Sequence, residues 1–392
     1  MTRPANGPRL PLVRPAADAK ATGSLDVLGI EHVPGISCGP LWPSYERSGA
    51  DRSAQTGCPF AMAVRQLHGV RDGMARVGLV LSAGGMVGHA FHAGVLSALE
   101  ETTGWDPRTA DVIVGTSAGS VVAAMLRAGF SAADVANRAR GRPISPAGAL
   151  LEQKASLGGA RRPLRGPAGR GPGMASPARV ARALWEPWRV GPGSLVAAVL
   201  PRGRSSTDPV SAPLRGLYGS GWPRKPTWIT AVELDRGRRV VFGRPGAPSA
   251  AIADAVAASC AIPGYFEPVT IDGVRYVDGG AHTPSNADVL AEERLDLVIV
   301  SSPMSSALGT LRVGLDLPVR QAVGLALTRE VAALRRRGIR VTIFQPTVAD
   351  QRVMAGNPLD AAKRAPVCEQ VQRSTRERLG RTSERRLVEM LA

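Results

Sequence analysis

The segment that decides the fold is DVIVGTSAGSVVAAML, residues 111–126. The apolar run at 111–114 is typical of a buried strand, and the small and apolar residues after it predict a helix from about 117 to 129. Between them lies a Gly-x-Ser-x-Gly turn, which holds Ser117 at its apex with the hydroxyl exposed. Gly115 and Gly119 lack the Cβ atoms that would collide where the helix and the strand nearly touch. The segment therefore favours Ser117 as a nucleophile, and the alternative is a packing turn of small residues.

Apolar runs without polar alternation continue on both sides of this segment. They predict further strands at 77–81, 227–234, 239–242, 275–277, 295–300 and 340–344. Helical patterns lie between these runs, through Val95, Leu96 and Leu99, at 250–260, at 320–337 and after Asp360. Buried strands that alternate with helices predict an α/β fold, a three-layer α/β/α sandwich with a mostly parallel central sheet.

A glycine-rich turn that ends at Gly88 follows the first predicted strand and opens a helix. Backbone N–H groups at such a helix start are free to point at an anion. We predict that the amides of Gly84, Gly85 and Met86 form an oxyanion hole, which stabilises the negative charge of a carbonyl oxygen during acyl transfer. The alternative is a nucleotide-binding loop, but Ala83 stands where the first glycine of that fingerprint belongs.

Asp278 closes the short strand predicted at 275–277 and is followed by Gly279 and Gly280. A carboxylate at a strand end beside two glycines can approach another loop closely. There it would accept the proton of the Ser117 hydroxyl, as a general base does. An ordinary Asp-Gly turn is the alternative.

His282 raises a second alternative for the base. A Ser-Asp-His triad in the chain order of α/β-hydrolases needs a histidine after Ser117, and only His282, four residues beyond Asp278, meets that condition. We interpret His282 as a loop or surface residue and favour a dyad. The five histidines and four cysteines lack the spacing of metal ligands, so no metal is expected.

The serine turn, the glycine loop and the Asp-Gly-Gly segment together resemble the patatin-like phospholipase family. The resemblance rests on residues 79–88, 115–120, 258–263 and 269–280, and it covers about 77–302. It implies a Ser-Asp dyad without histidine, in which Ser117 is the nucleophile, Asp278 the base and the glycine loop the oxyanion hole. It also implies hydrolysis of lipid acyl esters without a cofactor. An acyltransferase of the same chemistry and a non-catalytic membrane-binding protein are the alternative functions.

Three positions depart from the pattern of that family. Ala83 replaces the first glycine of the loop, Val87 replaces a basic residue, and one extra residue lies between Gly88 and Gly94. A changed side chain leaves the backbone N–H groups in place. We therefore expect the oxyanion hole to persist.

The positive charge of the chain is concentrated in one segment. The 392 residues carry a formal net charge of +17, and residues 138–225 hold 16 basic and three acidic residues. This segment is rich in Pro, Gly and Arg, with one short helix predicted near 177–185, and its Trp185 and Trp188 suit a lipid headgroup interface. We predict an insertion or lid that contacts anionic membranes. A solvated insertion is the alternative, and no nucleic-acid-binding pattern is recognisable.

The remaining sequence gives the domain organisation. Residues 1–73 show weak periodicity and are interpreted as a poorly ordered extension, 77–302 as the catalytic domain, and 303–392 as its α/β completion with Arg-rich helices. No apolar stretch approaches 18 residues and the N-terminus lacks the apolar region of a signal peptide. Widely spaced cysteines indicate free thiols in a reducing compartment. The sequence therefore predicts a cytoplasmic protein that associates at most peripherally with membranes.

Overall fold

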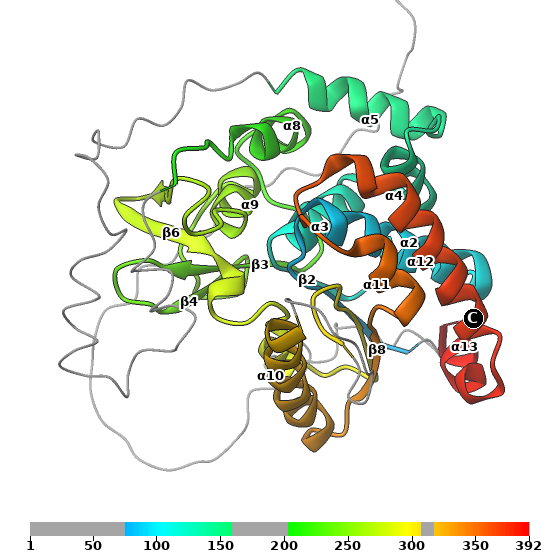
Figure 1. Cartoon of the computed structure of the whole chain (residues 1–392). Helices are drawn as coiled ribbons and strands as arrows, with labels where there is room; N and C mark the ends of the chain where they lie inside the picture. Colours follow the sequence, from blue (N-terminus) through cyan, green and yellow to red (C-terminus); the bar gives the residue numbers. More distant parts are fainter. Residues whose placement is uncertain (1–74, 159–202, 307–316, 392) are drawn as a thin grey trace, which may run out of the picture. The chain divides into compact units, whose positions relative to one another are not determined.

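The buried apolar runs form the strands of one eight-stranded sheet. In the computed structural model, which describes residues 75–158, 203–306 and 317–391, these strands lie at the centre of the molecule (Figure 1). The strands are β1 (Val77–Leu81), β2 (Val112–Gly115), β3 (Thr227–Glu233), β4 (Arg239–Phe242), β5 (Val269–Ile271), β6 (Val274–Asp278), β7 (Leu297–Ser301) and β8 (Arg340–Phe344).

Five adjacent strands of the sheet are parallel. The order is β5-β6-β3-β2-β1-β7-β8, with β4 also paired to β3. The pairs from β3 through β2, β1 and β7 to β8 are parallel, whereas β4, β5 and β6 pair in antiparallel fashion at one edge. This topology confirms the predicted α/β fold with a mostly parallel sheet.

Helices connect the strands and cover the sheet. They are α2 (Gly85–Thr103), α3 (Ala118–Ala128), α4 (Ala132–Arg140), α5 (Pro146–Ser156), α8 (Asp208–Tyr218), α9 (Ile252–Ser259), α10 (Leu317–Arg336), α11 (Val348–Met354), α12 (Arg364–Leu379) and α13 (Arg385–Leu391). Short 3₁₀ turns include η3 (Gly279–Ala281) and η4 (Ala287–Leu290).

The two faces of the sheet have separate hydrophobic cores. Alternate residues of one strand point to opposite faces, so Leu79 packs with α2, α3, α4 and α12, whereas Val80 packs with η4 and α10. Figure 1 shows α10 apart from the cluster of α2, α3, α4 and α12. The sheet is therefore the middle of three layers, as predicted.

The segment 138–225 contains more helix than its composition predicted. Besides the end of α4, it holds α5 and α8, which pack against each other, and α8 packs on α9. The expectation of one short helix in this segment was therefore wrong, and the helix predicted near 177–185 lies outside the described residues. Helix α5 has an exposed, mixed surface without a clear apolar period, and Pro213 interrupts the sequence signal of α8, although Leu214 and Leu217 form its buried face.

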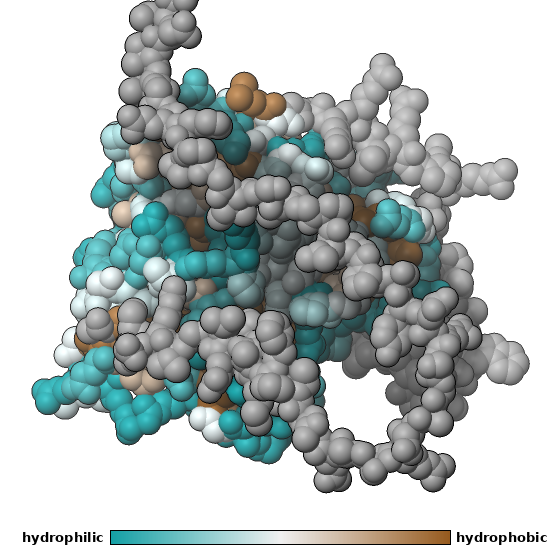
Figure 2. Space-filling model, turned by 180° about the vertical axis from the view of Figure 1, so that it is seen from behind, coloured by the Kyte–Doolittle hydropathy of each residue, from teal (hydrophilic) through white to brown (hydrophobic). Residues whose placement is uncertain are grey.

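The described surface is mainly hydrophilic on the face shown in Figure 2, where hydrophobic residues form small separate groups. Among the described residues, the large hydrophobic side chains that are exposed are Leu150, Leu157, Tyr265, Leu325 and Val348. No described helix has the length and apolar character needed to cross a bilayer.

Candidate active site

Ser117 occupies a strained turn between β2 and α3. Its backbone has φ 52° and ψ −121°, a region that a residue with a side chain rarely adopts. Two hydrogen bonds hold this conformation. The Ser117 N–H donates to Ser259 Oγ at 2.8 Å, and Ser120 Oγ donates to the Ser117 carbonyl at 2.6 Å. The serine turn is thus fixed both by its own helix and by the end of α9.

The glycines beside Ser117 are required by close packing. A Cβ atom on Gly119 would lie 1.9 Å from the Leu81 carbonyl oxygen, and one on Gly115 would lie 2.5 Å from Ser120 Cα. Helix α3 therefore crosses directly over the end of β1. This contact explains why the sequence places glycine on both sides of the turn.

Asp278 ends β6 and lies beside Ser117. Both residues are buried, with 4% of Ser117 and 5% of Asp278 exposed. The Asp278 carboxylate accepts a hydrogen bond from the Gly280 N–H at 2.7 Å, and the neighbouring Ser117 side chain favours its ionised form. Burial raises the pKa of Asp278 to about 6, although these two neighbours act in the opposite direction.

Gly279 and Gly280 let the Asp278 turn approach its neighbours closely. A Cβ atom on Gly279 would lie 2.5 Å from the Thr230 carbonyl oxygen of β3. One on Gly280 would lie 3.0 Å from Asp278 Oδ1 and 3.5 Å from Ala83 Cβ. The turn is therefore adjacent to the glycine loop as well as to Ser117.

The glycine loop presents backbone amides at the start of α2. Ala83 N–H donates to the Pro284 carbonyl at 2.8 Å, and Val87 N–H donates to the Pro358 carbonyl at 3.0 Å. Between these two anchors, the amides of Gly84, Gly85 and Met86 have no recorded partner within the described part of the chain. Gly85 has φ 63°, a conformation that glycine adopts without strain. Gly88, one turn into α2, packs near Pro303.

His92 anchors the base of this loop. Its Nε2–H donates to the Ser82 carbonyl at 2.8 Å, which leaves Nδ1 to accept from Ser301 Oγ at 2.8 Å. Burial lowers the pKa of His92 to about 3, so the ring stays neutral at physiological pH. The sequence gave no sign of these partners of His92.

His282 forms no hydrogen bond with Ser117 or Asp278 in the described structure. Its backbone N–H donates to the Gly279 carbonyl at 3.0 Å, and the residue is exposed to solvent. Partial burial and the Arg239 charge lower the pKa of His282, against the effect of Asp288. The described residues also contain no group of three or more His, Cys, Asp or Glu side chains that could hold a metal ion.

The site draws together every residue selected from the sequence except His282. It also contains residues for which the sequence gave no role, above all Ser259 and Asn286. Ser259 lies in the segment 258–263, which contributed to the family resemblance, so the sequence could have singled it out. Its hydrogen bond with the Ser117 N–H depends on the tertiary fold. Asn286 follows the Asp-Gly-Gly turn and had no distinguishing pattern.

Comparison with known proteins identifies the family of this chain. The sequence model of the patatin-like phospholipase family matches residues 79–189 and 190–291, which is more than half of the chain and includes Ser117 and Asp278. The chain therefore belongs to the patatin-like phospholipase family. Membership of this family supports a lipid acyl hydrolase function.

Several solved structures are distantly similar. VipD from Legionella pneumophila has 15% identity and a TM-score of 0.34 over 77% of this chain and 67% of that chain. ExoU of the ExoU–SpcU complex from Pseudomonas aeruginosa has 20% identity and a TM-score of 0.31 over 79% and 52%. Human GIVD cytosolic phospholipase A2 has 14% identity and a TM-score of 0.34 over 84% and 62%. The chain thus spans about half to two thirds of these proteins, and no curated protein sequence matches it.

Proposed function

We propose that this protein is a serine lipid acyl hydrolase that works with a dyad of Ser117 and Asp278. The observation that carries the proposal is that the strained Ser117 lies beside the buried Asp278 carboxylate, close enough to lower the pKa of that carboxyl group. A nucleophilic hydroxyl needs a base within hydrogen-bond reach. The carboxylate is that base, and no second side chain is required to orient it because the Gly280 N–H already does so.

The reaction follows from this geometry. Ser117 Oγ attacks the ester carbonyl carbon while its proton passes to Asp278, and the C–O bond to the alcohol then breaks as Asp278 returns the proton to the leaving group. Water next attacks the acyl-enzyme and loses a proton to Asp278, which passes it to Ser117 Oγ when the fatty acid leaves. The amides of Gly84, Gly85 and Met86 stabilise the oxyanion in both steps, and one such donor typically contributes about 3–4 kcal/mol.

Substitution of the dyad tests the proposal. We expect Ser117→Ala and Asp278→Asn each to lower kcat for a p-nitrophenyl acyl ester at least about 1,000-fold, as loss of a nucleophile or its base does in serine hydrolases. Circular dichroism should show folded protein for both. A fluorophosphonate probe should label the wild type but not Ser117→Ala, while the exposed control Ser156→Ala should keep both labelling and turnover.

Other outcomes would identify another function. Activity that survives in Asp278→Asn but is lost in His282→Ala would replace the dyad by a triad. A wild-type protein that hydrolyses no ester and is not labelled by the fluorophosphonate probe would contradict the proposal. Mass spectrometry of a mixed lipid extract shows whether water or an alcohol accepts the acyl group, which separates a hydrolase from an acyltransferase.

We also propose that the segment 138–225 contacts anionic membranes, for which α5 gives structural support. Leu150, Lys154 and Leu157 follow a spacing of four and three residues and so share one face. All three are exposed, Leu150 by 67% and Leu157 by 79%. Exposed leucines beside a lysine, in the most basic part of the chain, suit the headgroup region of an anionic bilayer.

A further inference from the structure

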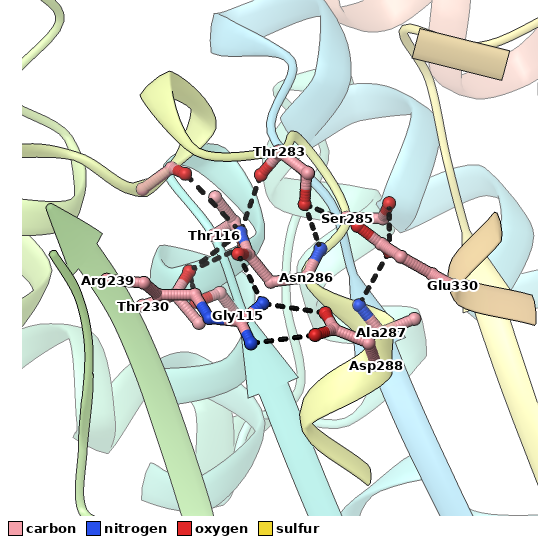
Figure 3. Close-up of polar contacts among 11 residues, drawn as sticks. Gly115, Thr116, Thr230, Arg239, Thr283, Ser285, Asn286, Ala287, Asp288 and Glu330 are labelled. Atoms are coloured by element: carbon pink, nitrogen blue, oxygen red, sulfur yellow. Dashed lines mark hydrogen bonds and ion pairs between the residues drawn. The ribbon is translucent and has the colours of Figure 1, made fainter. Parts of the chain in front are cut away.

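A buried polar network joins residues next to Ser117 and Asp278 with strand β3 and the loop of Asn286 (Figure 3). At its centre is Asn286, which is fully buried. Its Nδ2 lies 3.2 Å from Thr116 Oγ1, 3.3 Å from Thr230 Oγ1 and 3.4 Å from the Gly279 carbonyl oxygen. These groups belong to three segments that are distant in sequence. They are the serine turn, strand β3 and the Asp-Gly-Gly turn.

The location of these segments gives the network its importance. In the sheet, β3 lies between β2, which leads to Ser117, and β6, which ends at Asp278. Ser117 and Asp278 therefore come from strands on either side of β3, and β3 itself carries neither residue. Thr116 and Thr230 join the two sides through a hydroxyl–hydroxyl hydrogen bond of 2.8 Å, and Asn286 lies against both.

Arg239 determines which way the Asn286 amide faces. Its Nη1 donates to Asn286 Oδ1 at 3.3 Å, and its two terminal nitrogens donate to the Asp288 carboxylate at 2.6 and 2.7 Å. A guanidinium has no acceptor atom, so the amide oxygen of Asn286 must face it. The amide N–H groups consequently face the Thr283 carbonyl oxygen, which lies 2.5 Å from Nδ2, together with Thr116 of the serine turn and the more distant Gly279 carbonyl, as Figure 3 shows for the labelled residues.

Glu330 of α10 holds the loop on both sides of Asn286. Its buried carboxylate accepts hydrogen bonds from the hydroxyls of Thr283 and Ser285, the latter at 2.6 Å, and from the Ala287 N–H at 2.8 Å. Asn286 itself has φ 53°, a left-handed conformation that asparagine and aspartate tolerate better than most residues. The loop is thus fixed by a helix on the opposite side of the sheet from α3.

We infer that Asn286 is a positioning residue, which keeps Ser117 and Asp278 side by side by bonding to Thr116 and Gly279, the residues next to them. This inference rests on the proposed dyad. Loss of the amide N–H groups would free the Thr116 hydroxyl and the Gly279 carbonyl to shift apart, without removing a reacting group. A displacement of about 1 Å at a reacting centre can lower the rate about 100-fold.

The test is Asn286→Asp, which keeps the size and the left-handed backbone preference but replaces both N–H donors by an oxygen. We expect kcat for the p-nitrophenyl ester to fall on the order of 10- to 100-fold while KM changes less than about twofold. Thr116→Val removes the hydroxyl that accepts from Asn286 and keeps the shape of the side chain. It should likewise lower kcat with little change in KM. The double variant should lose little more than either single one, because both changes break the same bridge.

Gln372→Met is the matched control. It removes another buried amide, which donates to Ser97 Oγ at 3.0 Å between α12 and α2, and it should leave kcat within about twofold. If Asn286→Asp does not fold by circular dichroism, Thr116→Val decides the test alone. If the wild type is active and a folded Asn286→Asp or Thr116→Val variant has the same kcat, only the inference about Asn286 is overturned. A wild type without turnover or fluorophosphonate labelling would overturn the proposed dyad as well.

Discussion

Burial sets the chemistry of Asp278. The carboxyl group lies at the end of β6 and is removed from water, which disfavours its ionised form and raises its pKa to about 6. An aspartate with this pKa is still ionised at neutral pH but binds a proton more tightly than an exposed one. Such a base is well matched to a reaction near neutral pH, because efficient proton transfer needs a pKa near the working pH.

The pH dependence of turnover should report this pKa. Since the proposed dyad requires an ionised Asp278 to accept the Ser117 proton, we expect kcat/KM to fall as the pH drops through about 6 and to level off above about 7. Rates of p-nitrophenyl ester hydrolysis measured between about pH 4.5 and 8, with separate checks of folding at each pH, give the acidic limb of the pH–rate profile. A limb near pH 4 would mean that the base has the pKa of an exposed aspartate, against the burial described for Asp278.

At the scale of elements, the site depends on how closely α3 crosses β1. The N-terminus of α3 lies so near the end of β1 that the Leu81 carbonyl occupies the space of a Cβ on Gly119. The same crossing brings the Thr116 N–H to the Leu81 carbonyl at 3.0 Å. The serine turn, β1 and the glycine loop that follows β1 are therefore fixed to one another by backbone contacts.

Gly119→Ala tests this contact. The added methyl carbon would overlap backbone that cannot move independently, so we expect a loss of at least about 3 kcal/mol in the free energy of unfolding, measured by urea denaturation. Gly380→Ala is the control, since its φ is −71° and its Cβ would meet the nearest atom at an ordinary 3.6 Å. The control should be neutral or slightly stabilising. Equal stability of Gly119→Ala and the wild type would contradict the close crossing.

At the scale of the whole molecule, the C-terminal part packs against the sheet and against α2. Strand β8 extends the central sheet beside β7. Helix α12 packs along α2 so closely that a Cβ atom added to Gly94 would lie 2.7 Å from the Cys368 carbonyl oxygen. We therefore propose that 303–392 form the α/β completion of the domain that begins at 77. Residues 1–73 and the tryptophans at 185 and 188 lie outside the described residues, and their proposed roles as an extension and a membrane contact stay predictions.

The exposed face of α5 gives a whole-molecule prediction. We expect Leu150→Ser combined with Leu157→Ser to weaken binding to vesicles rich in phosphatidylglycerol about tenfold or more, because each buried leucine contributes about 1.5–3 kcal/mol. Co-sedimentation with those vesicles and with neutral phosphatidylcholine vesicles measures the effect. Leu325→Ser, at a leucine of α10 that is 52% exposed, is the control and should bind like the wild type. Unchanged binding of the α5 variant would exclude this face.

Much of the fold could be predicted because its signals are local. The runs at 77–81, 239–242 and 340–344 form strands with those bounds. Helices α5 and α8 were not predicted, since α5 lacks a clear apolar period and Pro213 interrupts α8, while both helices pack against each other in the tertiary structure.

By itself the sequence determined the strand, turn and helix around Ser117, the glycine loop after the first strand and the aspartate at a strand end, since these depend on residue size and spacing within a few positions. Only the tertiary structure decided that Ser117 and Asp278 meet across β3, that Asp278 is buried with a raised pKa, and that Asn286 lies between their turns. Burial and hydrogen bonding of these groups depend on segments far apart in the chain, and no local pattern encodes such contacts.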